Sequence, residues 1–210
     1  VRAALPKSQG PQLATLADEP PTGKGWLSEV KFDGYRLLAW LENGTVRLVT
    51  RGGLDWTRRL PAVARAITGL KVDAALLDGE LTALRPDGIS SFADLQVALS
   101  DGRDGKLFFY LFDLLHLNGW DLRGCRLADR KARLRGLSDW RGALRYSDHM
   151  EGGADQFLHK ACETALEGIV CKEADAPYRA GRTRAWLKIK CQQREEFVVL
   201  GWTRPEGGMF

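Results

Sequence analysis

The sequence predicts an α+β fold, in which antiparallel or mixed sheets are flanked by helices. Short apolar stretches of strand length alternate with helix signals along 210 residues, a length that forms one large core or two small lobes around a cleft. The dipeptide Asn43-Gly44 separates two such stretches and is a strong signal for a β-hairpin. The chain has no internal repeat and no low-complexity segment, so neither a solenoid nor a disordered protein is expected.

The first half of the chain is predicted to contain the hairpin, a short helix and a buried strand. Residues 37–41 and 45–50 are the two hairpin strands. Pro61 begins a helix that ends at Gly69, because proline suits the first helical turn and glycine commonly follows the last. The next strand covers residues 74–81.

The second half is predicted to contain more helices and at least one central strand. Ser91, with Asp94 three residues later, is typical of the start of a helix, here over residues 95–99. Residues 107–115 are apolar on both faces, which indicates a strand covered on both sides. Helices are then expected over 129–137 and 155–166, and strands over 168–172, 186–190 and 197–202.

The amino-terminal segment, residues 1–24, is predicted to be a linker-like extension. It contains several prolines and glycines, although Leu13 and Leu16 are apolar enough to dock on the folded body. The chain begins with Val1 rather than Met. We therefore expect it to be a fragment of a longer polypeptide.

Charge and cysteine content limit the possible classes of protein. A net charge of +4 and a pI near 8.9 permit a polyanionic partner but do not by themselves identify a nucleic-acid-binding protein. No apolar run approaches the roughly 18 residues of a membrane span, and no signal peptide is evident, so a cytoplasmic protein without a membrane partner is expected. The four cysteines lack a C-x-x-C pair and the three histidines lack metal-ligand spacing, which favours reduced thiols and argues against structural zinc.

Five short polar motifs carry most of the functional information. A lone Lys-x-Asp-Gly motif arises often by chance, but five motifs in a fixed order within 210 residues form a specific pattern. The motifs are Glu29–Arg36, Asp78–Glu80, Phe112-Asp113, Glu167–Lys172 and Trp186–Lys190.

Lys31 is the candidate nucleophile. A free lysine has a pKa of about 10.4 and becomes nucleophilic only through desolvation or nearby positive charge. Its sequence neighbours are apolar, and Arg36, Lys188 and Lys190 would supply the charge if they converge on it. Taken without the other motifs, the segment around Lys31 is also consistent with an ordinary surface lysine.

Asp33, Glu80 and Glu167 are candidate ligands for a divalent cation. Hard oxygen ligands suit Mg²⁺ or Mn²⁺, which triphosphate substrates bring with them. A glycine adjoins each carboxylate, a pattern expected where a ligand approaches the backbone closely. The competing interpretation is that these acids are solvated or pair with nearby arginines.

Lys188 and Lys190 are candidate phosphate ligands. On a strand they share one face, and two cations held together are stabilised by an anion between them. Phe112 is expected either to stack on a purine or to be a core aromatic. Arg51 is expected either to bind phosphate or to lie exposed in a turn. Arg182 and Arg184 lie in a basic loop over residues 178–184, and they are expected to contact either a nucleic-acid backbone or only solvent.

Together the segments resemble the adenylation domain of the ATP-dependent DNA ligases, and within that family most closely the ligase D subfamily. The stretches that carry this resemblance are residues 25–36, 178–182, 186–191 and 194–203. The resemblance implies the two-subdomain nucleotidyltransferase fold, with AMP in a cleft between antiparallel sheets. The resemblance implies ATP and either Mg²⁺ or Mn²⁺ as cofactors. It implies DNA with nicked or broken ends as the partner.

The resemblance also implies a role for each candidate residue. Lys31 would attack the α-phosphate of ATP and carry AMP as a phosphoramidate. The other roles would be adenine binding by Glu29, Val30 and Phe112; ribose and phosphate contact by Arg36, Arg51 and Glu80; metal binding by Asp33, Glu167 and Glu80; and α-phosphate binding by Lys188 and Lys190.

The implied domain organisation is an adenylation domain over residues 25–195 and the start of an oligonucleotide-binding (OB) fold domain over residues 196–210. Most of that second domain is expected to be missing from this chain. The implied setting is double-strand break repair by non-homologous end joining at the bacterial nucleoid, with polymerase and nuclease modules in the same polypeptide and an end-binding protein. Two alternatives stay open: an RNA ligase or capping-type nucleotidyltransferase, and a noncatalytic nucleic-acid-binding module.

Overall fold

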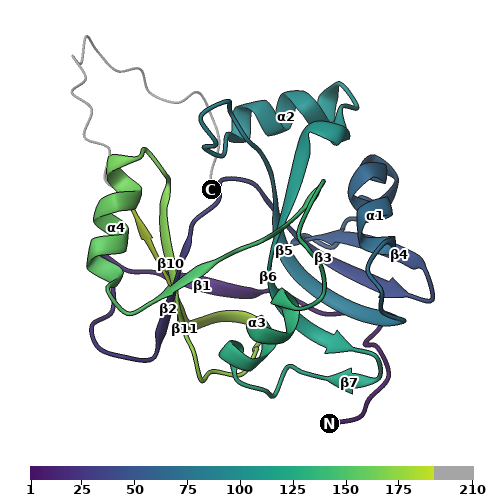
Figure 1. The fold of residues 1–210 in the computed structure, drawn as a ribbon, viewed down its shortest axis with the longest axis horizontal. Helices are drawn as coiled ribbons and strands as arrows, with labels where there is room; N and C mark the ends of the chain where they lie inside the picture. The colour runs from purple at the N-terminus through teal and green to yellow at the C-terminus, as the bar shows by residue number, and fades with distance from the viewer. Residues whose placement is uncertain (192–210) are drawn as a thin grey trace, which may run out of the picture.

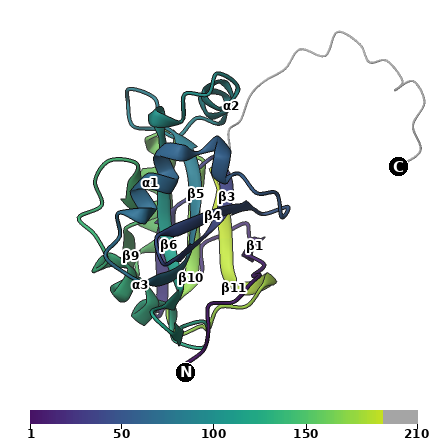
Figure 2. The same ribbon diagram turned by 90° about the vertical axis from the view of Figure 1, so that its right-hand side faces the viewer.

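The computed structural model describes residues 1–191 of the chain. Two β-sheets pack against each other, and the helices lie around them (Figure 1). Figure 2, turned by 90°, shows β4 (Thr45–Thr50) and α1 (Pro61–Thr68) nearest the viewer. The predicted α+β class with mixed sheets is confirmed.

The five-stranded sheet has the order β1-β11-β10-β2-β9. Only the pairing of β1 with β11 is parallel; the other pairings are antiparallel. Its strands are β1 (Gln12–Leu16), β2 (Trp26–Val30), β9 (His149–Glu151), β10 (Gly168–Glu173) and β11 (Gly181–Lys190).

The six-stranded sheet has the order β4-β3-β5-β6-β7, and β8 also pairs with β6. The pairing of β6 with β8 is parallel, and the others are antiparallel. Its strands are β3 (Tyr35–Glu42), β4 (Thr45–Thr50), β5 (Ala74–Ala83), β6 (Leu107–Leu117), β7 (Trp120–Asp121) and β8 (Leu144–Tyr146).

Local sequence chemistry explains the elements that were predicted best. Asn43 and Gly44 both have positive φ, 47° and 78°, as the tight turn between β3 and β4 requires. Ser91 accepts a hydrogen bond from the Asp94 N–H at 3.2 Å and begins α2, as predicted. The helices are α1 (Pro61–Thr68), α2 (Phe92–Ser100), α3 (Leu127–Arg135) and α4 (Ala154–Glu163), with 3₁₀ turns η1 (Thr57–Arg59) and η2 (Asp104–Lys106).

Apolar side chains fill the space between the sheets and beneath the helices. Leu38 and Leu115 of the six-stranded sheet pack in one cluster with Trp186 of the five-stranded sheet. Val63 of α1 lies in the core of the six-stranded sheet, and Ala161 of α4 lies against the five-stranded sheet. The two sheets are therefore joined by an apolar interface, and Trp186 of this interface also lines a cavity between them.

Three glycines next to the candidate carboxylates have a different role from the one predicted. We expected them to allow a ligand to approach the backbone, but each lies against the backbone of a neighbouring strand. A side chain at any of them would clash there, because its Cβ atom would lie closer to a backbone oxygen than Cβ atoms do in real proteins. The distances from an added Cβ are 2.1 Å to Leu81 O at Gly34, 2.6 Å to Tyr110 O at Gly79 and 2.0 Å to Ile189 O at Gly168.

The amino-terminal range 1–24 is not entirely a linker. Residues Gln12–Leu16 form β1, which pairs with β11. The expected basic loop over 178–184 is likewise shorter, because β11 begins at Gly181 and includes Arg182 and Arg184. The predicted strand over 197–202 and the predicted domain over 196–210 lie outside the described residues.

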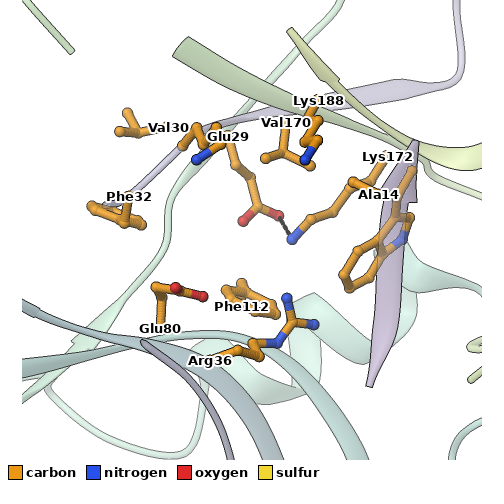
Figure 3. A pocket seen from close by; sticks show the side chains of 12 residues that line it. Ala14, Glu29, Val30, Phe32, Arg36, Glu80, Phe112, Val170, Lys172 and Lys188 are labelled. Atoms are coloured by element: carbon orange, nitrogen blue, oxygen red, sulfur yellow. Dashed lines mark ion pairs between the residues drawn. The ribbon is translucent and has the colours of Figure 1, made fainter. Parts of the chain in front are cut away.

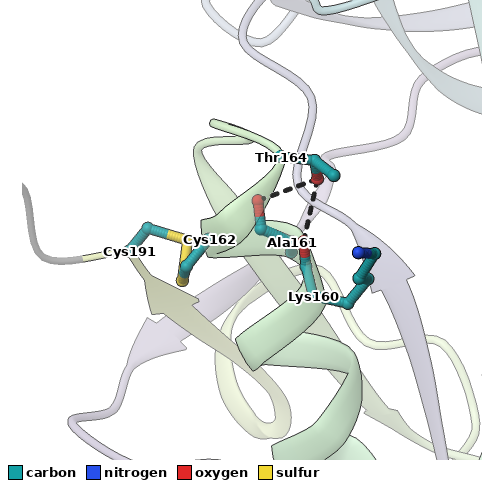
Figure 4. The surroundings of a disulfide bond; sticks show 5 residues. All are labelled: Lys160, Ala161, Cys162, Thr164 and Cys191. Atoms are coloured by element: carbon teal, nitrogen blue, oxygen red, sulfur yellow. Dashed lines mark hydrogen bonds between the residues drawn. A yellow bond between two sulfur atoms is a disulfide. The ribbon is translucent and has the colours of Figure 1, made fainter.

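The prediction that all four cysteines are free thiols is wrong. Cys162 and Cys191 form a disulfide that joins the last turn of α4 to the residue after β11 (Figure 4). Their Cα atoms are 5.3 Å apart although 29 residues separate them in sequence, a proximity that cysteine spacing alone does not reveal. Cys125 and Cys171 are free.

Removal of this disulfide is expected to lower the free energy of unfolding by about 3–4 kcal/mol, because the cross-link restricts the unfolded chain. The measurement is equilibrium urea unfolding of Cys162→Ser against the oxidised parent protein. Cys125→Ser, at a free and half-buried cysteine, is the matched control and should change stability by less than about 0.5 kcal/mol. Equal stability of Cys162→Ser and the parent, or four titratable thiols in the unreduced protein, would contradict the cross-link.

In the described part of the chain, no helix combines the length and apolar character needed to cross a membrane.

Candidate active site

A cavity of about 150 Å³ lies between the two sheets, and strands of both sheets line it (Figure 3). The six-stranded sheet contributes Arg36, Glu80 and Phe112 on one side. The five-stranded sheet contributes Glu29, Val30, Val170, Lys172, Trp186 and Lys188 on the other, and Lys31 and Phe32 come from the segment after β2. Most of the residues predicted to bind a nucleotide therefore meet in one place.

Lys31 lies directly after β2, beside the start of β10. Its N–H donates a hydrogen bond to Gly168 O at 2.9 Å, which fixes the backbone. Its ammonium group forms an ion pair with Glu167, and the side chains are 18% and 26% exposed. Lys190 Nζ lies 3.5 Å from the other Glu167 oxygen. The candidate nucleophile is thus held beside a carboxylate at the cavity, with solvent access for a substrate.

Lys188 and Lys190 lie on one face of β11, as predicted from their alternation with buried Ile189. Burial lowers the pKa of Lys188, and the charges of Lys31 and Lys190 lower it further. Lys31, Lys188 and Lys190 thus bring positive charge together here, against the single carboxylate of Glu167. A phosphate group bound among these lysines would supply the missing negative charge.

Glu29 is buried beneath the cavity between two lysines. Its Oε1 lies 2.9 Å from both Lys131 Nζ and Lys172 Nζ, and Ser147 donates a hydrogen bond to Oε2 at 2.8 Å. Burial raises the pKa of Glu29, but the two lysine charges outweigh it, so the pKa lies below its ordinary value. Burial lowers the pKa of Lys172 to about 8. Glu29 is therefore a buried carboxylate that holds Lys131 and Lys172 in place at the edge of the cavity.

Phe112 forms an aromatic wall of the cavity. Its ring meets Trp186 edge to face with centroids 6.0 Å apart. Lys172 Nζ lies 4.1 Å and the Arg36 guanidinium 4.3 Å from the ring centroid, both within cation–π range. Phe112 is only 6% exposed, so a flat heterocycle such as a purine base could stack on its ring only after a cation moves aside.

Glu80 and Arg36 lie side by side on the six-stranded sheet, where Arg36 pairs in register with Glu80 across β3 and β5. Burial is the main cause that raises the pKa of Glu80 to about 7, and the charges of Arg36 and Lys31 oppose it. Burial would lower the pKa of Arg36, but its ion pair with Asp78 outweighs burial and raises it. Arg36 is thus a permanent cation at the cavity.

Several predicted site residues lie outside the cavity lining. Asp33 makes its hydrogen bonds through the main chain, from its N–H to Ser90 and from Thr82 to its carbonyl oxygen. Arg51 is exposed at the end of the β3–β4 hairpin, in an adjoining depression that shares Arg36 and Glu80 with the cavity. Exposed Arg182 and Arg184 lie at the beginning of β11.

The three candidate metal ligands do not form a complete protein cage. Within residues 1–191, no group of three or more His, Cys, Asp or Glu side chains is arranged to hold a metal ion. Mg²⁺ usually keeps several waters and takes one or two carboxylates together with substrate phosphates. Glu167 and Glu80, both beside Lys31, fit that more limited requirement.

Comparison with known proteins identifies the family. The sequence profile described as the ATP dependent DNA ligase domain matches residues 11–190, which include every residue of the cavity. The chain belongs to this ligase domain family.

The most similar curated relatives include multifunctional end-joining proteins. The ligase domain is 42% identical over 208 residues to the multifunctional non-homologous end joining protein LigD of Pseudomonas aeruginosa, and 36% identical over 184 residues to LigD of Mycobacterium tuberculosis. These alignments cover 98% and 87% of this chain but only 25% and 24% of the relatives. The chain thus spans about a quarter of the LigD proteins it matches.

Solved structures agree with the ligase domain at the level of the fold. A mycobacterial DNA ligase D in complex with ATP has a TM-score of 0.73 at 33% identity, and the match covers 86% of this chain and 60% of that one. The ligase domain of M. tuberculosis LigD gives a TM-score of 0.74 with the same identity and coverage. Chlorella virus DNA ligase-adenylate, at 18% identity and a TM-score of 0.64, shares the fold.

The sequence interpretation did not single out several residues of the site. Lys172 ends a recognised motif and lies two residues after Val170, so strand alternation was a usable signal that it faces the cavity. Lys131 gave no such signal, because a lysine within a polar helix is ordinarily solvated. Asp78 and Tyr178, which contact each other below Arg36, were quoted only as parts of motifs.

Proposed function

We propose that this domain transfers AMP from ATP to its own Lys31 and then to DNA, as the catalytic core of an ATP-dependent DNA ligase. The observation that carries the proposal is the position of Lys31 at a cavity with an aromatic wall and a cluster of lysines. Phe112 would stack on the adenine, and Glu29 and Val30 would lie at its edge. Lys188, with Lys190 next to it, would hold the α-phosphate.

The proposed reaction has three displacements at phosphorus. The deprotonated Lys31 nitrogen attacks the α-phosphorus of ATP; a P–N bond forms, and pyrophosphate leaves with the electrons of the broken P–O bond. A DNA 5′-phosphate oxygen then attacks the same phosphorus and releases the lysine, which regains a proton. Finally a 3′-hydroxyl attacks the 5′-phosphate, AMP leaves, and the phosphodiester forms. Arg36, Lys188 and Lys190 would stabilise charge on the phosphate oxygens throughout.

Mg²⁺ or Mn²⁺ bound with the triphosphate would neutralise phosphate charge and help orient the leaving group. We propose Glu167 and Glu80 as the carboxylates nearest that ion. Asp33 would belong to the group only if its segment moves toward the cavity.

The nucleotide consumed tests the proposal. The purified chain is incubated with Mg²⁺ and either α-labelled ATP or α-labelled GTP, and covalent label is measured after denaturation. We expect label from ATP alone. Label from GTP would favour a capping-type enzyme. No label from either nucleotide, with the fold intact, would favour a noncatalytic nucleic-acid-binding module.

Glu167→Ala is expected to slow adenylylation by roughly 10²-fold or more, because an electrostatic group next to the reacting atoms is removed. The measurement is the labelling rate across a titration of Mg²⁺ and Mn²⁺, with the melting temperature as control. Since Glu167 is 26% exposed, the fold should persist. A large drop in melting temperature with an unchanged metal dependence would show a structural role instead.

We further propose that the domain acts in double-strand break repair at the nucleoid, as part of a longer end-joining protein. The names of its LigD relatives, which describe non-homologous end joining, support this setting. The proposed partners are nicked or broken DNA, polymerase and nuclease modules, an end-binding protein and the OB-fold domain. Arg182 and Arg184 would contact the DNA phosphates, and Arg51 would contact the ribose and phosphate of the nucleotide. Salt-dependent sealing of a pre-adenylylated nick tests the DNA step, and absence of sealing at low salt would argue against it.

A further inference from the structure

A buried hydrogen-bonded cluster lies behind Arg36 and joins the two sheets. We call Gln12, Arg36, Asp78 and Tyr178 the Asp78 cluster. Arg36 binds both carboxylate oxygens of Asp78, with its Nη2 2.7 Å from Oδ2, and the Tyr178 hydroxyl donates to Oδ2 at 2.6 Å. The Gln12 N–H donates to the Tyr178 hydroxyl at 2.8 Å, and Arg36 Nη2 donates to Gln12 O at 3.3 Å.

The cluster is closed to solvent everywhere except at Arg36. Asp78 and Gln12 are fully buried, and Tyr178 is 6% exposed. Asp78 lies on β5 of the six-stranded sheet, whereas Gln12 lies on β1 of the five-stranded sheet. Tyr178 belongs to the segment between β10 and β11, and its ring meets Trp186 edge to face at 6.0 Å. Only Arg36 of these four residues lines the cavity.

The bonds of Arg36 leave one part of its guanidinium for a ligand. Within residues 1–191, Nε and Nη2 bind Asp78 and Gln12, whereas Nη1 makes no hydrogen bond. A guanidinium held by a two-point contact with a carboxylate has a fixed plane, so its remaining N–H groups point in a fixed direction. Burial and the charge of Asp78 raise the pKa of Tyr178, so its hydroxyl stays a donor to that carboxylate.

We propose that Tyr178 is a positioning residue for nucleotidyl transfer, acting through Asp78 to orient Arg36 toward the sugar and phosphates of ATP. This inference rests on the proposed function. It assigns a role to a residue that does not touch the nucleotide. It also gives the Asp78-Gly79-Glu80 motif two distinct tasks, since Asp78 faces the cluster and Glu80 faces the cavity.

Tyr178→Phe tests the inference because it removes the hydroxyl and keeps the ring contact with Trp186. We expect the single-turnover rate of adenylylation at saturating ATP to fall by roughly 10- to 100-fold, as misorientation of a substrate-binding group does. Tyr110→Phe is the matched control. The half-buried Tyr110 ring stacks on Phe32 with centroids 4.0 Å apart, and the Tyr110 hydroxyl makes no hydrogen bond within the described residues. The adenylylation rate of Tyr110→Phe should therefore equal that of the parent protein.

A double-mutant cycle separates positioning from general stability. In an Arg36→Ala background, Tyr178→Phe should cause no further loss of rate, because the group that it orients is gone. Equal losses with and without Arg36 would overturn the inference and show a structural role. If Tyr178→Phe does not fold at the assay temperature, Asp78→Asn is put through the same cycle, with the same expectation and the same overturning result.

The outcomes also distinguish this inference from the proposed function. If the parent protein takes no label from ATP, the proposed function fails. If the parent is labelled and Tyr178→Phe reacts at the parent rate, only the inference about Tyr178 is overturned.

Discussion

We expect Lys31→Ala to abolish covalent labelling by ATP, and Lys31→Arg to do the same. No other lysine of residues 1–191 lies both at the cavity and in ion-pair contact with Glu167 at the start of β10. Alanine has no nucleophile, and a guanidinium does not lose its proton in proteins. The measurement is label on the denatured protein after incubation with α-labelled ATP and Mg²⁺. The expected loss is complete, the largest effect predicted for any single residue.

Lys172→Ala is the control for this experiment, because it also removes a cavity lysine and it leaves Lys31 in place. It should slow labelling without abolishing it. Label that persists on Lys188 in Lys31→Ala would refute the assignment of the nucleophile.

Arg130→Met is expected to lower the free energy of unfolding by about 3–5 kcal/mol, the range for leaving a buried charge without its partner. Arg130 and Asp113 are 1% and 0% exposed and make a two-point ion pair with distances of 2.7 and 2.9 Å. Arg130 also donates to the carbonyl of Ala176 at 3.1 Å. The pair thus joins α3, β6 and the segment before β11. Its Asp113 directly follows Phe112 in β6.

Arg126→Met is the matched control, since Arg126 lies at the start of the same helix and pairs with Asp175 at the surface. An exposed pair of this kind contributes about 0–1 kcal/mol. Urea unfolding of both variants gives the comparison, and the double variant Arg130→Met/Asp113→Asn should recover part of the loss. Similar losses for Arg130→Met and Arg126→Met would mean that the buried pair has no special role in stability.

The sequence correctly predicted those elements that depend on residues close together in the chain. The β3–β4 hairpin follows from Asn43-Gly44, and α2 follows from Ser91, because a turn conformation or a cap depends on residues within a few positions of each other. Strand β1 was missed because its partner is far away in sequence: Gln12 pairs with Gly181. Prolines and glycines around a five-residue strand resemble a linker until that partner is known.

The candidate site was predictable where strand alternation or a motif fixed the direction of a side chain. Lys188 and Phe112, which were predicted to bind the nucleotide, both line the cavity, and their contact with a nucleotide stays a prediction. The supporting residues were not predictable in this way, because Lys131 and Tyr178 act through contacts that join distant segments: Lys131 lies on α3 and binds Glu29 of β2. The Cys162–Cys191 disulfide was missed for the same reason. Such contacts depend on how elements pack, and packing is not encoded in any short motif.

Whether Lys31 carries AMP can be decided by intact mass spectrometry of the purified chain, before and after incubation with ATP and Mg²⁺. We predict an increase in mass equal to one AMP residue, acid-labile as a P–N bond should be, and located by peptide mapping on Lys31. Addition of pyrophosphate should reverse it. An unchanged mass in the folded protein, or an AMP adduct on any residue other than Lys31, would refute the proposal that Lys31 is the nucleophile of an adenylyl transfer.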